Sequence, residues 1–264
     1  ALSIKPDYAQ AYNNMGITFK AQGNLDEAIE AYSKALSIRP DYAQTYYNMG
    51  IVLQDQGKLD KAIESYNKAL LLKTNYAQAY YNMGNALKDQ GKLDEAIESY
   101  NKALSIRPDY AQAYYNMGIA LQDQGKLDEA IEAYNKALSL EPNYAQAYYN
   151  IGIALQDQGK LDEAIESYNK ALSIKPNYAE IYNNMGIVLN NQGNWEEAIG
   201  AYSKALSIKP DSAETYNNMG AALKDQGKLD EAMEAYNKAL SIKPDYADAY
   251  NNLGATLKDQ GKLD

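Results

Sequence analysis

Residues 111–144 read AQAYYNMGIALQDQGKLDEAIEAYNKALSLEPNY. Apolar residues recur at helical spacing over residues 114–121, and this pattern stops at Gly125. A second apolar stripe covers residues 130–140 and stops before Pro142, which cannot continue a helix. The stretch therefore predicts two helices joined by a short turn.

The same pattern returns every 34 residues, as the spacing from Gly84 to Gly118 in two Asn-Met-Gly tripeptides shows. A fixed period of this length is typical of solenoids, in which stacked units bury a continuous core. A frame that starts at Ala9 gives one continuous solenoid of seven full repeats. The predicted repeats are residues 9–42, 43–76, 77–110, 111–144, 145–178, 179–212 and 213–246, preceded by the tail of an earlier repeat at 1–8 and followed by the first helix of an eighth at 247–264.

Residues at the expected helix ends support these boundaries. Gly125 suits the left-handed residue that ends a first helix. Asp41, followed by Gln44, predicts an aspartate cap at the start of the next first helix. A tyrosine precedes most first helices and should pack between neighbouring repeats. Ser212 replaces that tyrosine once, so we expect a looser joint between repeats 179–212 and 213–246.

Small residues stand where the two helices of a repeat must touch, and large residues fill the space between them. In repeat 111–144 the pattern consists of Tyr114, Met117, Gly118, Leu121, Ala130, Tyr134, Ala137 and Pro142. It resembles the signature of the tetratricopeptide repeat (TPR) family, and the resemblance covers essentially the whole chain. It implies an all-α fold, a right-handed superhelical solenoid of antiparallel helix pairs, in which the first helices line the concave side and the second helices the convex side.

The composition excludes several classes of function. The chain contains no Cys and no His, which removes thiol nucleophiles, disulfides, imidazole bases and nearly every structural zinc site. Its net charge of -10 argues against nucleic acid and anionic membranes as partners. Phosphate-loop and dinucleotide-binding motifs are missing, and the carboxylates recur identically from repeat to repeat, unlike a catalytic pair. We therefore expect a protein that is not an enzyme and needs no cofactor or metal. No apolar run is long enough to span a bilayer and the sequence shows no signal segment, so a cytoplasmic location is the default expectation.

Family geometry carries the second, fifth, sixth, ninth, twelfth and thirteenth positions of each repeat to the concave side. Asparagine is a mediocre helix former, so an unbroken row of it at the sixth position is not explained by propensity. Its amide can pair with the C=O and N–H groups of an extended peptide without reading side chains. The row resembles the asparagine ladder in the TPR superhelix of O-linked N-acetylglucosamine transferases, although recently copied repeats would also share residues without function. The row comprises Asn14, Asn48, Asn82, Asn116, Asn150, Asn184, Asn218 and Asn252.

Other residues at these positions would add to the groove. The middle repeats supply aromatic contact area at the fifth position, apolar side chains at the ninth and carboxylates at the thirteenth. Because the asparagines and tyrosines lie off the apolar stripe, we expect them to bind ligand while contributing little to the fold. The additional candidate residues are Tyr47, Tyr81, Tyr115, Tyr149, Ile119, Ile153, Asp89, Asp123 and Asp157.

The sequence thus predicts a protein–protein interaction scaffold that binds extended, neutral to basic peptide segments. Two other functions remain open. The uncovered helix at 247–264 and the helix tail at 1–8 could associate head to tail and build a structural superhelix. The array could also be the substrate-targeting arm of a larger enzyme such as a glycosyltransferase. A consensus-style engineered array is a further alternative, against which irregular residues such as Thr74 and Trp195 count.

Overall fold

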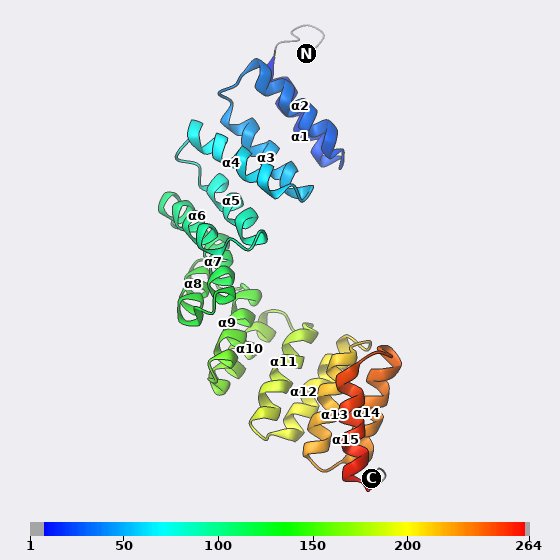
Figure 1. Ribbon diagram of the computed structural model, residues 1–264. Helices are drawn as coiled ribbons and strands as arrows, with labels where there is room; N and C mark the ends of the chain where they lie inside the picture. Colours follow the sequence, from blue (N-terminus) through cyan, green and yellow to red (C-terminus); the bar gives the residue numbers. More distant parts are fainter. Residues whose placement is uncertain (1–7, 262–264) are drawn as a thin grey trace. The chain divides into compact units, whose positions relative to one another are not determined.

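The computed structural model describes residues 8–261, which form α-helices and no strand (Figure 1). The chain divides into two compact units, residues 1–141 and 142–264. The first unit contains α1 (Ala9–Ala21), α2 (Leu25–Ile38), α3 (Ala43–Asp55), α4 (Leu59–Leu72), α5 (Ala77–Asp89), α6 (Leu93–Ile106), α7 (Ala111–Asp123) and α8 (Leu127–Leu140). The second contains α9 (Ala145–Asp157), α10 (Leu161–Ile174), α11 (Ala179–Asn191), α12 (Trp195–Ile208), α13 (Ala213–Asp225), α14 (Leu229–Ile242) and α15 (Ala247–Asp259).

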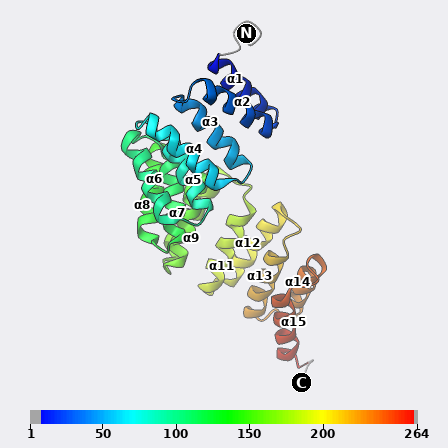
Figure 2. The ribbon, with the colours of Figure 1, turned by 45° about the horizontal axis from the view of Figure 1, so that its top comes forward.

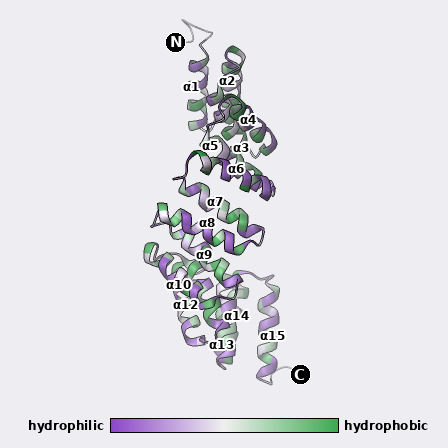
Figure 3. Cartoon of the chain, turned by 90° about the vertical axis from the view of Figure 1, so that its left-hand side faces the viewer, coloured by the Kyte–Doolittle hydropathy of each residue, from purple (hydrophilic) through white to green (hydrophobic). Residues whose placement is uncertain are grey.

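Helices pack in pairs within each unit (Figure 2). An odd-numbered helix packs most extensively on the even-numbered helix that follows it, and that helix packs in turn on the next odd-numbered one. Hydrophobic and hydrophilic residues alternate along the helices (Figure 3), as expected where one stripe of each helix is buried. None of the described helices has the length and apolar composition that crossing a bilayer requires. The predicted all-α solenoid of helix pairs is confirmed, while the predicted tail at 1–8 lies almost entirely outside the described residues.

The turn between the helices of a pair depends on a glycine, as predicted. Gly125 follows α7 with a φ of 75°, a left-handed conformation that side chains disfavour. Its N–H donates to the carbonyl of Gln122 at 2.8 Å, and the N–H of Lys126 donates to the carbonyl of Leu121 at 2.9 Å. These two hydrogen bonds form a Schellman motif, which ends α7 and turns the chain into α8.

The predicted aspartate cap is wrong. α3 begins at Ala43 with Tyr42 in the N-cap position, and no side chain caps it. Asp41 stands one residue too early, where its carboxylate accepts a hydrogen bond from Nε of Arg39 at 3.3 Å.

Ser212 does cap a helix. Its Oγ accepts the backbone N–H of Thr215 at 3.3 Å, at the start of α13. Helix α13 also packs on α12 at least as extensively as the equivalent helices pack elsewhere in the second unit. The looser joint predicted at this serine is therefore not found.

A close contact between a glycine and a tyrosine fixes how the helices of a pair pack. Gly118 of α7 faces the fully buried ring of Tyr134 on α8. A Cβ atom on Gly118 would lie 2.5 Å from Cε1 of that ring, so only glycine allows this approach. The tyrosine hydroxyl donates to Oε1 of Gln122 at 2.8 Å, which satisfies its polar end. The other six pairs are Gly16 with Tyr32, Gly50 with Tyr66, Gly84 with Tyr100, Gly152 with Tyr168, Gly186 with Tyr202 and Gly220 with Tyr236.

Glutamine and aspartate side chains connect neighbouring pairs near the start of the even-numbered helices. Nε2 of Gln124 donates to Oδ1 of Asp94 at 2.8 Å, across 30 residues of sequence. An aspartate in this first helical turn is also stabilised by the helix dipole. The same bond joins Gln56 to Asp26, Gln90 to Asp60, Gln192 to Asp162 and Gln260 to Asp230.

We predict opposite effects for two glycine substitutions at the same motif position. Gly118→Ala should lower the free energy of unfolding by about 1 to 3 kcal/mol, because its Cβ overpacks against Tyr134. Gly254 of α15 faces no side chain within 4 Å, so Gly254→Ala should raise stability by about 0.5 to 1 kcal/mol through helix propensity. Urea denaturation of both variants measures the difference. Changes in stability of the same sign in both variants would show that the contact with tyrosine is not the reason for glycine at this position.

We also predict that the chain unfolds at alkaline pH. Burial raises the pKa of Tyr32 and of Tyr236 to about 12, from an ordinary value near 10, and raises the pKa of Tyr66 and of Tyr100 further. Because the folded-state pKa lies above the unfolded one, this contribution to stability is complete below pH about 10 and is lost as pH rises through the folded pKa. Circular dichroism and tyrosinate absorbance should therefore change together.

The matched variant for the alkaline transition is Tyr32→Phe. Its ring stays buried, and the hydroxyl of Tyr32 has no hydrogen-bond partner among the described residues. Removing this one ionisable group should move the alkaline midpoint upward. A midpoint that stays fixed or falls would contradict ionisation of buried tyrosines as the cause.

Candidate functional site

The predicted asparagine row lies on the odd-numbered helices. In each unit, we call the surface that carries the second, fifth and sixth positions of its repeats the ladder face. The side chains of the row are half-buried, apart from the exposed Asn14. They therefore do not project freely into solvent, and their hydrogen-bond partners determine which amide groups are left to bind a ligand.

Within each unit, the amides of the row donate a hydrogen bond to the preceding repeat of the same unit. Nδ2 of Asn82 donates to the hydroxyl of Tyr47 at 3.2 Å, and Nδ2 of Asn116 donates to the hydroxyl of Tyr81 at 2.9 Å. The two residues of each bond are 35 positions apart, so the bond joins the sixth position of one repeat to the fifth of the repeat before it. In the second unit, Nδ2 of Asn184 donates to the hydroxyl of Tyr149 at 3.1 Å.

The ladder continues where the fifth position is asparagine. Nδ2 of Asn48 donates to Oδ1 of Asn13 at 3.1 Å, and Nδ2 of Asn252 donates to Oδ1 of Asn217 at 2.9 Å. At the fifth position, both tyrosine and asparagine thus supply an oxygen that accepts the hydrogen bond from the next repeat. Side chains that were expected to contribute little to the fold therefore also join neighbouring repeats. Asn218 bonds to Asn183 in the same way, at 3.3 Å.

The amides keep some hydrogen-bonding capacity. Asn116 uses both N–H groups, one on Tyr81 and one on Oδ1 of Asn85 at 2.9 Å, and its own Oδ1 has no partner among the described residues. Asn82 uses one N–H and likewise leaves its Oδ1 without a partner in residues 8–261. Since their other bonds hold these amides, each presents an oxygen in a fixed direction.

The tyrosines of the ladder face also pack among rings. The ring of Tyr47 lies 6.2 Å from that of Tyr66 and 4.9 Å from that of Tyr76, measured between centroids. Burial raises the pKa of Tyr47, while the hydrogen bond from Asn82 opposes the shift. Tyr47, Tyr81, Tyr115 and Tyr149 are all half-buried, so each offers a ligand only part of its ring.

The remaining predicted residues differ in availability. Ile119 and Ile153 are half-buried. Asp89 forms an ion pair with Lys88 at 3.2 Å. Asp123 and Asp157 are exposed and form no ion pair within the described residues, so these two carboxylates can face a ligand.

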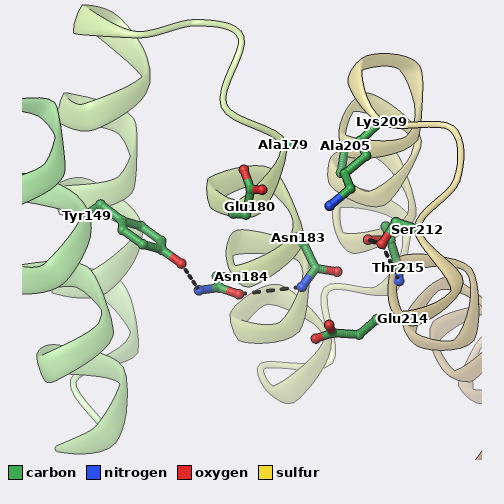
Figure 4. Close-up of a pocket in the computed structure, with 10 residues that line it drawn as sticks. All are labelled: Tyr149, Ala179, Glu180, Asn183, Asn184, Ala205, Lys209, Ser212, Glu214 and Thr215. Carbon is green, nitrogen blue, oxygen red and sulfur yellow. Dashed lines mark hydrogen bonds between the residues drawn. The ribbon is translucent and has the colours of Figure 1, made fainter. Parts of the chain in front are cut away.

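The ladder face holds one feature that sequence reasoning missed. A pocket of about 240 Å³ opens in the second unit, on the part of this face formed by α9, α11 and α13 (Figure 4). The sequence signal was the coincidence of two non-aromatic residues, Asn183 and Ser212, in one repeat. The pocket is lined by Tyr149, Ala179, Glu180, Asn183, Asn184, Ala205, Lys209, Ser212, Glu214 and Thr215.

Family models identify the kind of array. A model of the C-terminal domain of cilia and flagella-associated protein 70 matches residues 73–264. A model of the TPR repeat matches residues 18–57 and 53–91. The chain belongs to the tetratricopeptide repeat family. The recognition made from the sequence is thereby confirmed.

Solved TPR-like structures agree with this assignment. A crystal structure of MamA is 36% identical with a TM-score of 0.60, covering 61% of this chain and 94% of that one. YrrB, described as a TPR protein with an unusual peptide-binding site, is 26% identical with a TM-score of 0.61, covering 72% and 97%. A TPR protein from Parabacteroides merdae shares the fold at 21% identity, with a TM-score of 0.69 and coverage of 95% and 99%. No curated protein matches this chain.

Within residues 8–261, no group of His, Cys, Asp or Glu is placed to hold a metal ion. The side chains of the ladder face offer hydrogen bonding and ring contact, with exposed carboxylates at the thirteenth position.

We predict that Asn82 and Tyr47 are energetically coupled across the joint of this TPR array. Asn82→Ala and Tyr47→Phe each remove one partner of the same hydrogen bond. The free energies of unfolding of the parent, both single variants and the double variant should give a coupling of about 0.5 to 1.5 kcal/mol. Asn82→Ala should also raise the pKa of Tyr47 further, since it removes the donor. Effects that simply add would refute a structural role for the ladder.

Proposed function

We propose that the ladder face binds an extended segment of another polypeptide, mainly through the segment's main chain. The observation that carries this proposal is the set of fixed amides, which recur once per repeat. Asn82 and Asn116 each have an Oδ1 without a partner in residues 8–261, and such an oxygen can accept a main-chain N–H. A main-chain contact is indifferent to the ligand's side chains, so many sequences satisfy it.

The inter-repeat bonds favour binding because they orient the amides in advance. A free asparagine side chain loses rotamer entropy when it first makes a contact, which reduces affinity. Asn116 is already held by Tyr81 and by Asn85. The proposed ladder therefore combines a structural role with a binding role in the same side chain.

Charge supports a neutral to basic segment. Asp123 and Asp157 are exposed carboxylates at the thirteenth position without an ion pair among the described residues. The chain as a whole has a net charge of -10, which attracts basic segments and repels nucleic acid. The similarity to YrrB, whose description includes a peptide-binding site, supports the same kind of ligand. The array would thus act as a scaffold that holds a partner protein by an unfolded stretch.

Two sets of substitutions test this function. Both remove the same hydrogen bonds between repeats, but only one removes the amides. The first set changes three asparagines of the row to alanine, namely Asn82, Asn116 and Asn184. It removes their hydrogen bonds to Tyr47, Tyr81 and Tyr149 together with the three amides themselves. The second set changes the three tyrosines to phenylalanine. It removes the same inter-repeat hydrogen bonds but keeps the amides. Peptides retained from an array of unstructured neutral and basic segments serve as ligands, and calorimetry measures their affinity.

The asparagine set should weaken binding by at least about tenfold, because each lost contact contributes about 0.5 to 1.5 kcal/mol. The loss should be similar for unrelated peptides, and the phenylalanine set should bind nearly as the parent does. Equal losses in both sets would show that the amides act only through the fold. Unchanged affinity in the asparagine set would exclude them from binding altogether.

A further inference from the structure

A tyrosine at the last position of a repeat has three partners where two repeats meet. The ring of Tyr76 lies 4.9 Å from the ring of Tyr47, and Nζ of Lys73 lies 4.4 Å from the centroid of Tyr76. The hydroxyl of Tyr76 donates to Oε1 of Gln44, at the second position of the repeat, at 2.9 Å. A second ring, a cation and an oxygen acceptor therefore surround this phenol.

The ring and the cation recur at other joints. Tyr178 lies 5.4 Å from Tyr149 in the second unit, with Nζ of Lys175 at 4.2 Å from its centroid. Two joints lack the ring at the fifth position but keep the tyrosine at the last one. Its cation is then Arg39 over Tyr42 at 4.6 Å or Lys243 over Tyr246 at 4.9 Å.

Of the full repeats, only 179–212 lacks both rings. Asn183 stands at its fifth position and Ser212 at its last. The cation is still present as Lys209, which lies over no aromatic ring and forms no ion pair within residues 8–261. An acceptor is present too, because Glu180 replaces the glutamine at the second position. The pocket of about 240 Å³ lies among these residues.

Two of the residues that line this pocket are buried. Asn183 is 8% exposed and Thr215 is 4% exposed. Figure 4 shows the amine of Lys209 and the carboxylates of Glu180 and Glu214 around the same space. Neither carboxylate has an ion pair or a side-chain hydrogen bond among the described residues. An apolar cavity of about 150 Å³ is enough to hold benzene, so this volume admits a phenol ring.

We propose that the pocket formed by Asn183, Lys209 and Ser212 binds a tyrosine side chain of the extended segment on the ladder face. The ligand's ring takes the place of the ring that Ser212 lacks, with the ammonium of Lys209 over its face. Its hydroxyl donates to the carboxylate of Glu180, as Tyr76 donates to Gln44.

Lys209 distinguishes tyrosine from a basic side chain. The two carboxylates alone would also suit an arginine or lysine, but that side chain would meet the ammonium of Lys209 in the same pocket. A ring instead gains from this cation. Phenylalanine would fill the space without a donor for Glu180, so it should bind more weakly than tyrosine.

The binding of p-cresol, which is the tyrosine side chain itself, tests the pocket. A titration followed by NMR should produce saturable shifts of the side-chain amide resonances of Asn183 and Asn184. Ser212→Tyr fills the pocket from within and should weaken p-cresol binding by at least about tenfold. Ser212→Ala is the matched control, because it loses the helix cap but leaves the pocket open.

Two further measurements complete the test. Lys209→Gln should weaken p-cresol binding several-fold without changing the helix content. Ethylguanidinium, which represents an arginine side chain, should bind more weakly than p-cresol. Tighter binding of ethylguanidinium, or p-cresol shifts that persist in Ser212→Tyr, would overturn the proposal. So would the absence of any saturable shift in the parent.

This inference rests on the proposed function, since the tyrosine belongs to a bound segment, but the two can fail separately. If p-cresol does not bind, the pocket proposal is wrong whatever the asparagine variants do. If p-cresol binds while the asparagine variants keep full peptide affinity, the main-chain ladder is wrong and the pocket stands. In retained peptides that contain one tyrosine, Tyr→Ala in the peptide should lower affinity for the parent but not for Ser212→Tyr.

Discussion

The contact between a glycine backbone and a tyrosine ring sets the geometry on which the rest of this array depends. Tyr134 is fully buried against α7 at Gly118, where a Cβ atom would overlap the ring. Such contacts fix both the separation and the rotation of the paired helices, because packed interiors tolerate little change in volume. The rotation in turn decides which positions face the second helix of the pair. The fifth and sixth positions are left on the ladder face, next to the preceding repeat.

Two sets of hydrogen bonds then define how neighbouring pairs meet. One joins Asn116 to Tyr81 on the ladder face, and the other joins Gln124 to Asp94 near the start of α6. Each bond contributes little by itself compared with the burial of apolar side chains. Their value lies in specifying register, because a shifted joint would leave half-buried amides without partners. In a solenoid each repeat contacts only its neighbours, so a bond that recurs at several joints within a unit has a cumulative effect.

Much of the fold could be predicted from the sequence, because a 34-residue period repeats each helix signal many times. Gly125 ends its helix as predicted, since left-handed backbone is a local property. The prediction for Asp41 failed because an error of one residue moves a carboxylate out of capping reach. The structural role of Asn82 was missed for a different reason. Its partner lies 35 positions away, and the pattern of one helix carries no sign of it.

The pocket could not be predicted either, although its residues are visible in the sequence. The sequence predicted a looser joint where serine replaces tyrosine, whereas Ser212 caps α13 and the joint remains closely packed. The replacement of tyrosine by Ser212 removes the volume of one aromatic ring from this joint. Only the positions of α11 and α13 show that Asn183 removes a second ring beside it. In the sequence, a missing tyrosine can mean either a weaker joint or a pocket. Only the packing of the helices shows which of the two is present.

The exchange of tyrosine for asparagine at the fifth position separates two properties of the ladder face. Both residues offer an oxygen to the asparagine of the next repeat, as Tyr149 does for Asn184 and Asn183 does for Asn218. The joint therefore survives the exchange, while the ring does not. It follows that ring content can vary from repeat to repeat without breaking the hydrogen-bonded row. Under the proposed function, such a surface holds a main chain through its amides and selects one side chain where a ring is missing.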